Sequence, residues 1–245
     1  MNAEIELAKM RIRISFRFPE TIRLFTSFIT QNDCDSWDVR VEDEDIIRYP
    51  LICPDGRLDP FSEAYLLIPR ISVYLLRYRC ALIHGVSFLW HGHSWLILAP
   101  SGTGKTTQFH HLQRIMNGEI ELINGDKTAL SLNDDGKFWL YPSPWMGKEK
   151  ENGFATGELA GIVVLEQAIE NSISLLSPKD SVMQVFQQFF VADASEEELL
   201  IVGGMESRLL ETIPVWLLKN CGDIGSSQLM IRTLEEYGTN TKEKV

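Results

Sequence analysis

The sequence predicts an α/β protein in which a glycine-rich loop joins an apolar strand to a helix. The run Trp95 to Leu98 is apolar, residues 99–106 read Ala-Pro-Ser-Gly-Thr-Gly-Lys-Thr, and Thr106 to Met116 are expected to form the helix behind the loop. Two hairpin turns, at His91-Gly-His and Asn133-Asp-Asp-Gly, indicate a mixed sheet. An N-terminal α+β extension is expected to precede this core.

The N-terminal extension is expected to be a subdomain of residues 1–75 packed on a core of residues 76–245. Polar and apolar residues alternate from Arg11 to Phe18, which predicts a strand closed by Pro19. Thr21 to Ile29 resemble a short amphipathic helix. Apolar residues near a 3.6-residue period from about Phe61 predict a longer helix, which Pro69 is expected to interrupt or kink.

Further elements of the core follow from apolar runs and turn residues. A proline- and glycine-rich loop is expected from Pro142 to Gly157, and a helix is expected to start at Ser177 with Pro178 in its first position. The remaining predictions are strands at Ala81 to Trp90, Ile120 to Ile123, Thr128 to Leu132, Lys137 to Tyr141, Gly161 to Leu165 and Pro214 to Leu218, a last helix at Ser226 to Tyr237 and a polar tail at Gly238 to Val245.

Composition excludes several classes of protein. The 245 residues are 44% hydrophobic and 23% charged, which is typical of a chain with a large core. The net charge of −11 and the lack of Lys/Arg clusters disfavour binding to nucleic acid. No apolar run approaches the roughly 18 residues of a membrane helix, and the N-terminus lacks signal-peptide features. The four scattered cysteines are expected to be reduced thiols, and we expect a cytoplasmic protein without a membrane partner.

The glycine-rich loop matches a phosphate-binding motif, with Ala99 in place of its first glycine. In this motif small residues let successive backbone N–H groups face a nucleotide phosphate, and the helix N-terminus adds its positive dipole. Lys105 would reach the β- and γ-phosphate oxygens, and Thr106 would ligate Mg²⁺. The predicted nucleotide contacts are Ser101, Gly102, Thr103, Gly104, Lys105, Thr106 and Thr107.

Asp126 is the candidate carboxylate for phosphoryl transfer. It follows the apolar strand that ends at Asn124-Gly125, and it comes twenty residues after Thr106. At this position a carboxylate could hold Mg²⁺ or accept a proton from the attacking hydroxyl. The alternative is an aspartate that caps a turn.

Three motifs occur in an order that resembles the HPr kinase catalytic domain, whose fold is shared with ATP-dependent phosphoenolpyruvate carboxykinase. They are His84-Gly85, Ser101-Gly-Thr-Gly-Lys-Thr106 and Asn124-Gly-Asp126. The resemblance covers residues 76–165, with a weaker echo at residues 213–218. The chain is also similar to small HPr-kinase-like proteins of peptide natural-product pathways.

The resemblance implies an ATP- and Mg²⁺-dependent kinase with Lys105 and Asp126 as catalytic residues. It places His84 beside the phosphates, although a histidine at the end of an apolar strand is also a common core residue. Two departures disfavour HPr as the substrate: Lys127 stands where HPr kinases have a second aspartate, and Thr107 where they have a glutamate. The Arg-containing signature of that family is absent as well, and the chain is too short for a carboxykinase.

The phosphate acceptor is expected to be a serine or threonine hydroxyl of a peptide, or a small molecule. In the 142–157 loop, Trp145 and Lys148 are candidate substrate contacts, and the alternative is a surface loop with one buried tryptophan. A rival function is a nucleotide-binding switch with little or no catalysis, which Lys127 in place of a carboxylate keeps open. The sequence does not decide between ATP and GTP, or whether the protein forms a homo-oligomer.

Overall fold

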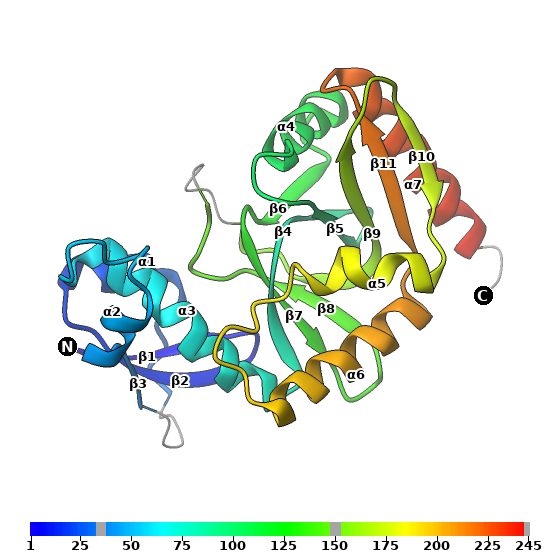
Figure 1. The fold of residues 1–245 in the computed structure, drawn as a ribbon. Helices are drawn as coiled ribbons and strands as arrows, with labels where there is room; N and C mark the ends of the chain where they lie inside the picture. The colour runs from blue at the N-terminus through cyan, green and yellow to red at the C-terminus, as the bar shows by residue number, and fades with distance from the viewer. Residues whose placement is uncertain (33–37, 148–152, 243–245) are drawn as a thin grey trace.

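The computed structural model describes residues 1–32, 38–147 and 153–242 and is a mixed α/β protein (Figure 1). Its strands are β1 Asn2–Leu7, β2 Met10–Ser15, β3 Asp38–Arg40, β4 Cys80–Trp90, β5 His93–Leu98, β6 Ile120–Asn124, β7 Lys127–Leu132, β8 Phe138–Tyr141, β9 Gly157–Gln167, β10 Ser172–Leu175 and β11 Val215–Asn220. Its helices are α1 Pro19–Leu24, α2 Asp43–Arg48, α3 Pro60–Leu76, α4 Lys105–Met116, α5 Pro178–Phe186, α6 Glu196–Thr212 and α7 Ile224–Lys242, with a 3-10 turn at Thr26–Phe28. Among the described residues, none of the helices has the length and apolarity to cross a bilayer.

The larger sheet has the order β10-β11-β9-β5-β4-β7-β8, and β6 pairs with β4. β8 also pairs with the start of β9, so the path from β9 through β5, β4, β7 and β8 returns to β9. β5, β9 and β11 run parallel, which brings their carboxyl ends to one edge of the sheet. In α/β sheets, ligands bind beyond such strand ends.

Helices cover both faces of this sheet. On one face, α4 and α7 pack against alternate residues of β4, β5, β9 and β11, including Trp95, Ile97 and Leu218. On the other face, α5 and α6 pack against the intervening residues, including Leu96, Leu98 and Val164. The alternation along each strand therefore explains both apolar layers.

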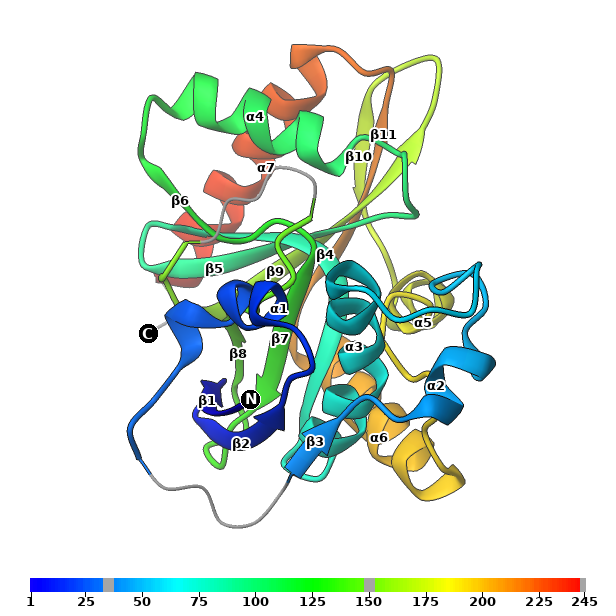
Figure 2. The same cartoon turned by 90° about the vertical axis from the view of Figure 1, so that its left-hand side faces the viewer.

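The N-terminal region has its own three-stranded sheet, β1-β2-β3, beside α3 (Figure 2). Its apolar cluster joins Ile12, Ile14 and Leu67 to residues of the larger sheet, including Leu82 and Ala129. This continuous packing seats α3 against β4 and brings its first turns to the functional site described below.

Several elements differ from the sequence predictions. α3 runs without interruption through Pro69, because the buried residues on both sides of it, including Ile68 and Ile71, hold the helix in place. The predicted 21–29 helix is a short α1 followed by a 3-10 turn. The predicted polar tail begins as helix, since α7 extends to Lys242. Strands β1 and β10 and helix α6 were not predicted.

Candidate functional site

The loop between β5 and α4 requires glycine at two positions. Gly102 has φ 82° and Gly104 has φ 104°, in the left-handed region that other residues rarely adopt. An added Cβ would meet no atom within 4 Å at either position, so conformation rather than space demands glycine. Gly104 precedes α4 without a side-chain cap, which leaves the first-turn N–H groups of that helix available to an anion.

Lys105 begins α4 and folds back over the loop. Its Nζ donates hydrogen bonds to the carbonyl oxygens of Ala99 at 2.6 Å and Pro100 at 3.2 Å. Burial lowers the pKa of Lys105; nearby Asp126 opposes this shift and Lys127 adds to it. The ammonium group is therefore held by two backbone carbonyl oxygens of the loop, and a phosphate oxygen could replace them as its hydrogen-bond acceptor.

The turn between β6 and β7 holds Asp126 by its backbone. The Asp126 N–H donates to the side-chain oxygen of Asn124 at 2.9 Å, and the Asn124 amide donates to the Ser143 carbonyl at 3.0 Å. The Asp126 carbonyl accepts from the N–H of Gly85 at 2.8 Å. A Cβ on Gly85 would lie 2.8 Å from the Ile97 carbonyl, so only glycine allows β4 this close to β5. The Asn-Gly-Asp and His-Gly motifs thus meet in space.

The Asp126 carboxylate faces two nitrogen groups. His84 Nε2 lies 3.2 Å from Oδ1, and Lys127 Nζ lies 2.5 Å from Oδ2. Burial alone would raise the pKa of Asp126, but the hydrogen bond from His84 and the charge of Lys127 outweigh it, and the pKa lies below its usual value. Asp126 is therefore ionised at neutral pH.

Lys127 is enclosed on its other sides by aromatic rings. Its side chain is 8% exposed, and Nζ lies 5.5 Å from the ring centroid of Tyr65 and 5.2 Å from that of Phe190. Both distances are within the range of cation–π attraction. Tyr65 comes from α3 and Phe190 from the segment after α5, so three distant parts of the chain fix this ammonium group.

The segment 143–147 supports the Asp126 turn from behind. The Ser143 hydroxyl donates to the Lys127 carbonyl, and the Lys127 N–H donates to the Trp145 carbonyl at 3.2 Å. Gly147 has φ 82°, and a Cβ there would lie 3.0 Å from the Cβ of Asp126. Gly147 is therefore needed both for its backbone conformation and for its contact with the carboxylate residue.

These groups surround a cleft of about 890 Å³, here called the main cleft. Two lysines and one aspartate are its charged described lining residues, so the balance favours an anion. Its wall is formed by Phe61, Tyr65, His84, Ser101, Gly102, Gly104, Lys105, Thr106, Thr107, Gly125, Asp126, Lys127, Gly147 and Phe190.

Most of the described site residues predicted from the sequence line the main cleft, but Thr103 and Trp145 do not. Thr103 bonds the Pro100 carbonyl at 2.9 Å and lies on the other side of the loop. Trp145 is 6% exposed, packs in the N-terminal cluster and donates from its indole to the Ala64 carbonyl at 2.8 Å, so it is a core residue rather than a cleft residue. Lys148 lies outside the described residues.

Sequence reasoning missed the aromatic wall of Phe61, Tyr65 and Phe190. Phe61 and Tyr65 have ring centroids 4.5 Å apart, and Phe61 is 65% exposed at the cleft. Their spacing of four residues on a predicted helix was available as a signal. No local sequence signal predicts that Phe190 lines the main cleft.

A divalent cation would have two protein ligands here. The Thr106 hydroxyl makes no hydrogen bond within the described part of the chain, and the ionised Asp126 carboxylate lies on the wall of the same cleft. Over residues 1–32, 38–147 and 153–242, no cluster of three His, Cys, Asp or Glu side chains could hold a metal. Thr106 and Asp126 could therefore hold Mg²⁺ only together with further ligands from phosphate and water, which Mg²⁺ accepts.

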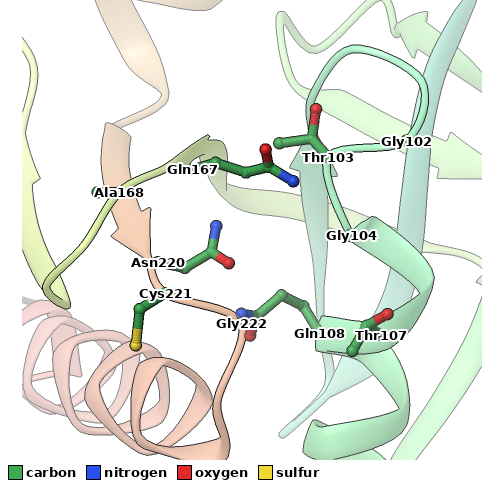
Figure 3. A pocket seen from close by; sticks show the side chains of 10 residues that line it. All are labelled: Gly102, Thr103, Gly104, Thr107, Gln108, Gln167, Ala168, Asn220, Cys221 and Gly222. Atoms are coloured by element: carbon green, nitrogen blue, oxygen red, sulfur yellow. The ribbon is translucent and has the colours of Figure 1, made fainter.

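A second cavity of about 480 Å³, here called the side pocket, lies between the loop and the ends of β9 and β11 (Figure 3). It shares Gly102, Gly104 and Thr107 with the main cleft. Among the described residues its lining has no charged side chain and consists of Gly102, Thr103, Gly104, Thr107, Gln108, Gln167, Ala168, Asn220, Cys221 and Gly222.

No protein-family model matches the chain, and no curated protein matches it either. A search of solved structures finds the Hpr(Ser) kinase/phosphatase from Coxiella burnetii, at 10% sequence identity and a TM-score of 0.35, covering 66% of this chain and 96% of that one. This is a distant structural similarity. A similarity at this level does not indicate an activity.

Proposed function

We propose that this protein is an ATP-dependent kinase that transfers the γ-phosphate to a hydroxyl group. The observation that carries the proposal is that the Lys105 loop and the Asp126, His84 and Lys127 group lie on the wall of one cleft. Ser101, Gly102, Gly104 and Thr107 would supply the remaining contacts to the nucleotide on this side of the loop. Positioning and charge neutralisation are the main requirements of phosphoryl transfer, and this constellation provides both.

The proposed step forms a bond between the acceptor oxygen and the γ-phosphorus. The bond from that phosphorus to the β–γ bridging oxygen breaks, and ADP leaves with that oxygen. The hydroxyl proton passes to the Asp126 carboxylate and then to solvent. Because the pKa of Asp126 is lowered, this carboxylate is a weak base, which suits a loose transition state in which the proton leaves late.

The other polar groups would hold the transferred phosphoryl group. Lys105 and Lys127 would neutralise negative charge on the γ-phosphate, and His84 would orient the Asp126 carboxylate. Mg²⁺ held by Thr106 and Asp126 would neutralise further phosphate charge.

The aromatic wall of Phe61, Tyr65 and Phe190 would face the acceptor, with Lys127 beside two of its rings. Phe61, Tyr65 and Phe190 line the main cleft together with the loop. This favours a serine or threonine hydroxyl of a peptide, or a small hydroxylated molecule, with an apolar group next to the hydroxyl. Trp145 is not part of this proposal because it is buried elsewhere.

The test uses the full chain, Mg-ATP labelled at the γ-phosphate, and a panel of serine and threonine peptides and small alcohols. The expected result is a phosphate-sized mass increase on an acceptor that an Asp126→Asn variant does not produce. Nucleotide binding is measured separately by thermal unfolding. Failure of millimolar Mg-ATP to stabilise the chain would remove the proposal altogether.

A nucleotide-binding switch is the second candidate. The ion pair of Lys127 with Asp126 favours it, because a carboxylate already neutralised at 2.5 Å is less available to a metal or a proton. A switch predicts nucleotide-dependent stabilisation with no phosphorylated acceptor in the whole panel.

A further inference from the structure

The side pocket lies where three strand ends meet the loop. β5 ends at Leu98 before the loop, and the ends of the parallel strands β9 and β11 are paired through Gln167 and Asn220. The Ala168 N–H donates to the Asn220 carbonyl at 2.9 Å and ties the two strand ends together. Figure 3 shows the side chains of Gln167 and Asn220 between these strand ends and the loop. The parallel strands thus build a pocket directly beside the main cleft.

The two cavities differ in charge. The main cleft contains Lys105, Asp126 and Lys127, whereas the described lining of the side pocket is neutral and rich in amides. Because both cavities share Gly102, Gly104 and Thr107, a molecule bound on the loop can extend into both. A nucleotide has the matching polarity, with charged phosphates at one end and an uncharged base at the other.

Gln108 forms a fixed part of the pocket wall. Its Nε2 donates to the Ser226 hydroxyl at 2.6 Å, and its Oε1 accepts from the Ser227 hydroxyl at 2.5 Å. Both ends of this amide are therefore engaged in joining α4 to α7. Gln108 shapes the pocket rather than offering a hydrogen bond to a ligand.

Asn220 presents one oriented acceptor. Its Nδ2 donates to the Glu166 carbonyl at 3.1 Å, and a carbonyl can only accept, so the NH₂ end of the amide is fixed on that side. The residue is 4% exposed, and no group in the described chain donates to its Oδ1. In Figure 3 the Asn220 oxygen lies on the side of α4. Asn220 Oδ1 is therefore an acceptor in the pocket that a donor group of a ligand could bond.

We propose that the side pocket binds the base of the nucleotide, and that Asn220 Oδ1 accepts a hydrogen bond from the 6-amino group of adenine. This proposal rests on the proposed function, because it takes the phosphates to lie on the loop. Guanine has a carbonyl oxygen at that position, and two acceptors facing each other repel. Asp223, three residues after Asn220 in sequence, does not line the pocket and already accepts from Asn171 at 2.7 Å and from the Ser226 N–H at 3.2 Å, so it is not placed to pair with guanine's donors.

The test measures dissociation constants by titration calorimetry with Mg²⁺ and four probes: ATP, purine riboside triphosphate, GTP and inorganic tripolyphosphate. Purine riboside triphosphate lacks only the 6-amino group. We expect it to bind about 3- to 10-fold more weakly than ATP, the value of one hydrogen bond. GTP is expected to bind at least about 10-fold more weakly than ATP, because it adds a repulsive contact. Tripolyphosphate reports on the loop alone.

Asn220→Ala should remove the preference for ATP over purine riboside triphosphate and leave the affinity for tripolyphosphate unchanged. Gln187→Ala, which removes an exposed amide outside both cavities, is the matched control and should keep the wild-type ratio. If Asn220→Ala unfolds, the wild-type series with the four probes still tests whether the 6-amino group is recognised, and a GTP preference there would still exclude the proposed contact.

Three results would overturn the inference. Equal binding of all three nucleotides and of tripolyphosphate would remove the base pocket and leave the loop site intact. A preference for ATP that persists in a folded Asn220→Ala variant, or a preference for GTP, would remove the role of Asn220. Binding of no probe at all would instead remove the proposed function itself.

Discussion

Replacing Asp126 with asparagine separates the chemistry of the site from its stability. The change preserves shape but removes the charge that Lys127 meets at 2.5 Å and His84 at 3.2 Å. Lys127 is 8% exposed and would lose its counter-ion, while the rings of Tyr65 and Phe190 remain beside it. We expect a loss of about 1–3 kcal/mol in unfolding free energy. For a chain of this size this corresponds to a fall in Tm of roughly 2–12 °C.

Turnover of the same Asp126→Asn variant should fall by at least about 100-fold, because the carboxylate would contact the acceptor proton and the metal. Mg-ATP should still raise the Tm, since the Lys105 loop is untouched. The assay is transfer of labelled phosphate, with thermal unfolding measured in parallel. Asp45→Asn is the matched control: its carboxylate is 2% exposed and pairs with Arg70 at 2.8 Å, outside both cavities. Near-normal turnover in Asp126→Asn would return Asp126 to the role of a turn residue.

The pH dependence of the Asp126 effect has a definite sign. The pKa of Asp126 is lower in the folded chain than in the unfolded chain, where it is about 3.9. The stability due to the charged carboxylate is therefore complete above the unfolded value and is lost as the pH falls through the folded value. The contribution of Asp126 ionisation to the difference in unfolding free energy between wild type and Asp126→Asn should be complete above about pH 5 and decrease only in stronger acid. Urea denaturation of both proteins from about pH 8 into acid below about pH 4 measures this difference in unfolding free energy.

Three further changes test other parts of the structure. Lys105→Ala removes the cation of the loop and should abolish most of the stabilisation by Mg-ATP, measured as a thermal shift. Gly147→Ala should strain the backbone, which has φ 82°, and place a Cβ 3.0 Å from the Cβ of Asp126, so we expect turnover to fall about 10-fold or more. Gly56→Ala is the control: it strains the backbone at φ 69°, but its added Cβ meets no atom within 4 Å, so turnover should be unchanged. Burial raises the pKa of Glu206 from 4.5 to about 7, so the contribution of Glu206 to wild-type stability should fall as the pH rises from about 4.5 to about 7 and be fully lost above that. Glu206→Gln should abolish that fall and be more stable at pH 8 by about 1–3 kcal/mol, as measured by urea denaturation.

Local sequence predicted the loop and its flanking elements because the signals there are short-range. Glycines 102 and 104 have the positive φ values that such a loop needs, and the apolar run before them is β5. Asn124-Gly-Asp126 could be recognised as a motif from the sequence. The hydrogen bonds that hold it, from the Asp126 N–H to Asn124 and from the Asn124 amide to Ser143, involve a later loop and could not be predicted.

The remaining site residues depend on contacts that sequence spacing does not encode. His84 reaches Asp126 because β4 pairs with β7 in the register that sets His84 opposite Lys127. Phe190 lies at the main cleft because the segment after α5 is hydrogen-bonded to β4: the Phe190 N–H donates to the Leu82 carbonyl at 2.9 Å. Trp145 lies in a loop rich in glycine and proline, which favours exposure, yet its contact with α3 buries it. Gln167 and Asn220 were overlooked although each ends an apolar strand.

The arrangement of charge gives a bound nucleotide one direction. Within a chain of net charge −11, the described lining of the main cleft carries two lysines against one aspartate, and the side pocket carries no charge. Triphosphate in the main cleft and base in the side pocket is therefore the orientation with the lower electrostatic energy, because the reverse would bury phosphate among neutral amides. In that orientation the terminal phosphate points away from β11 and toward His84 and Asp126. In the proposed binding mode the base would lie at the ends of β9 and β11, and the terminal phosphate would face the aromatic wall.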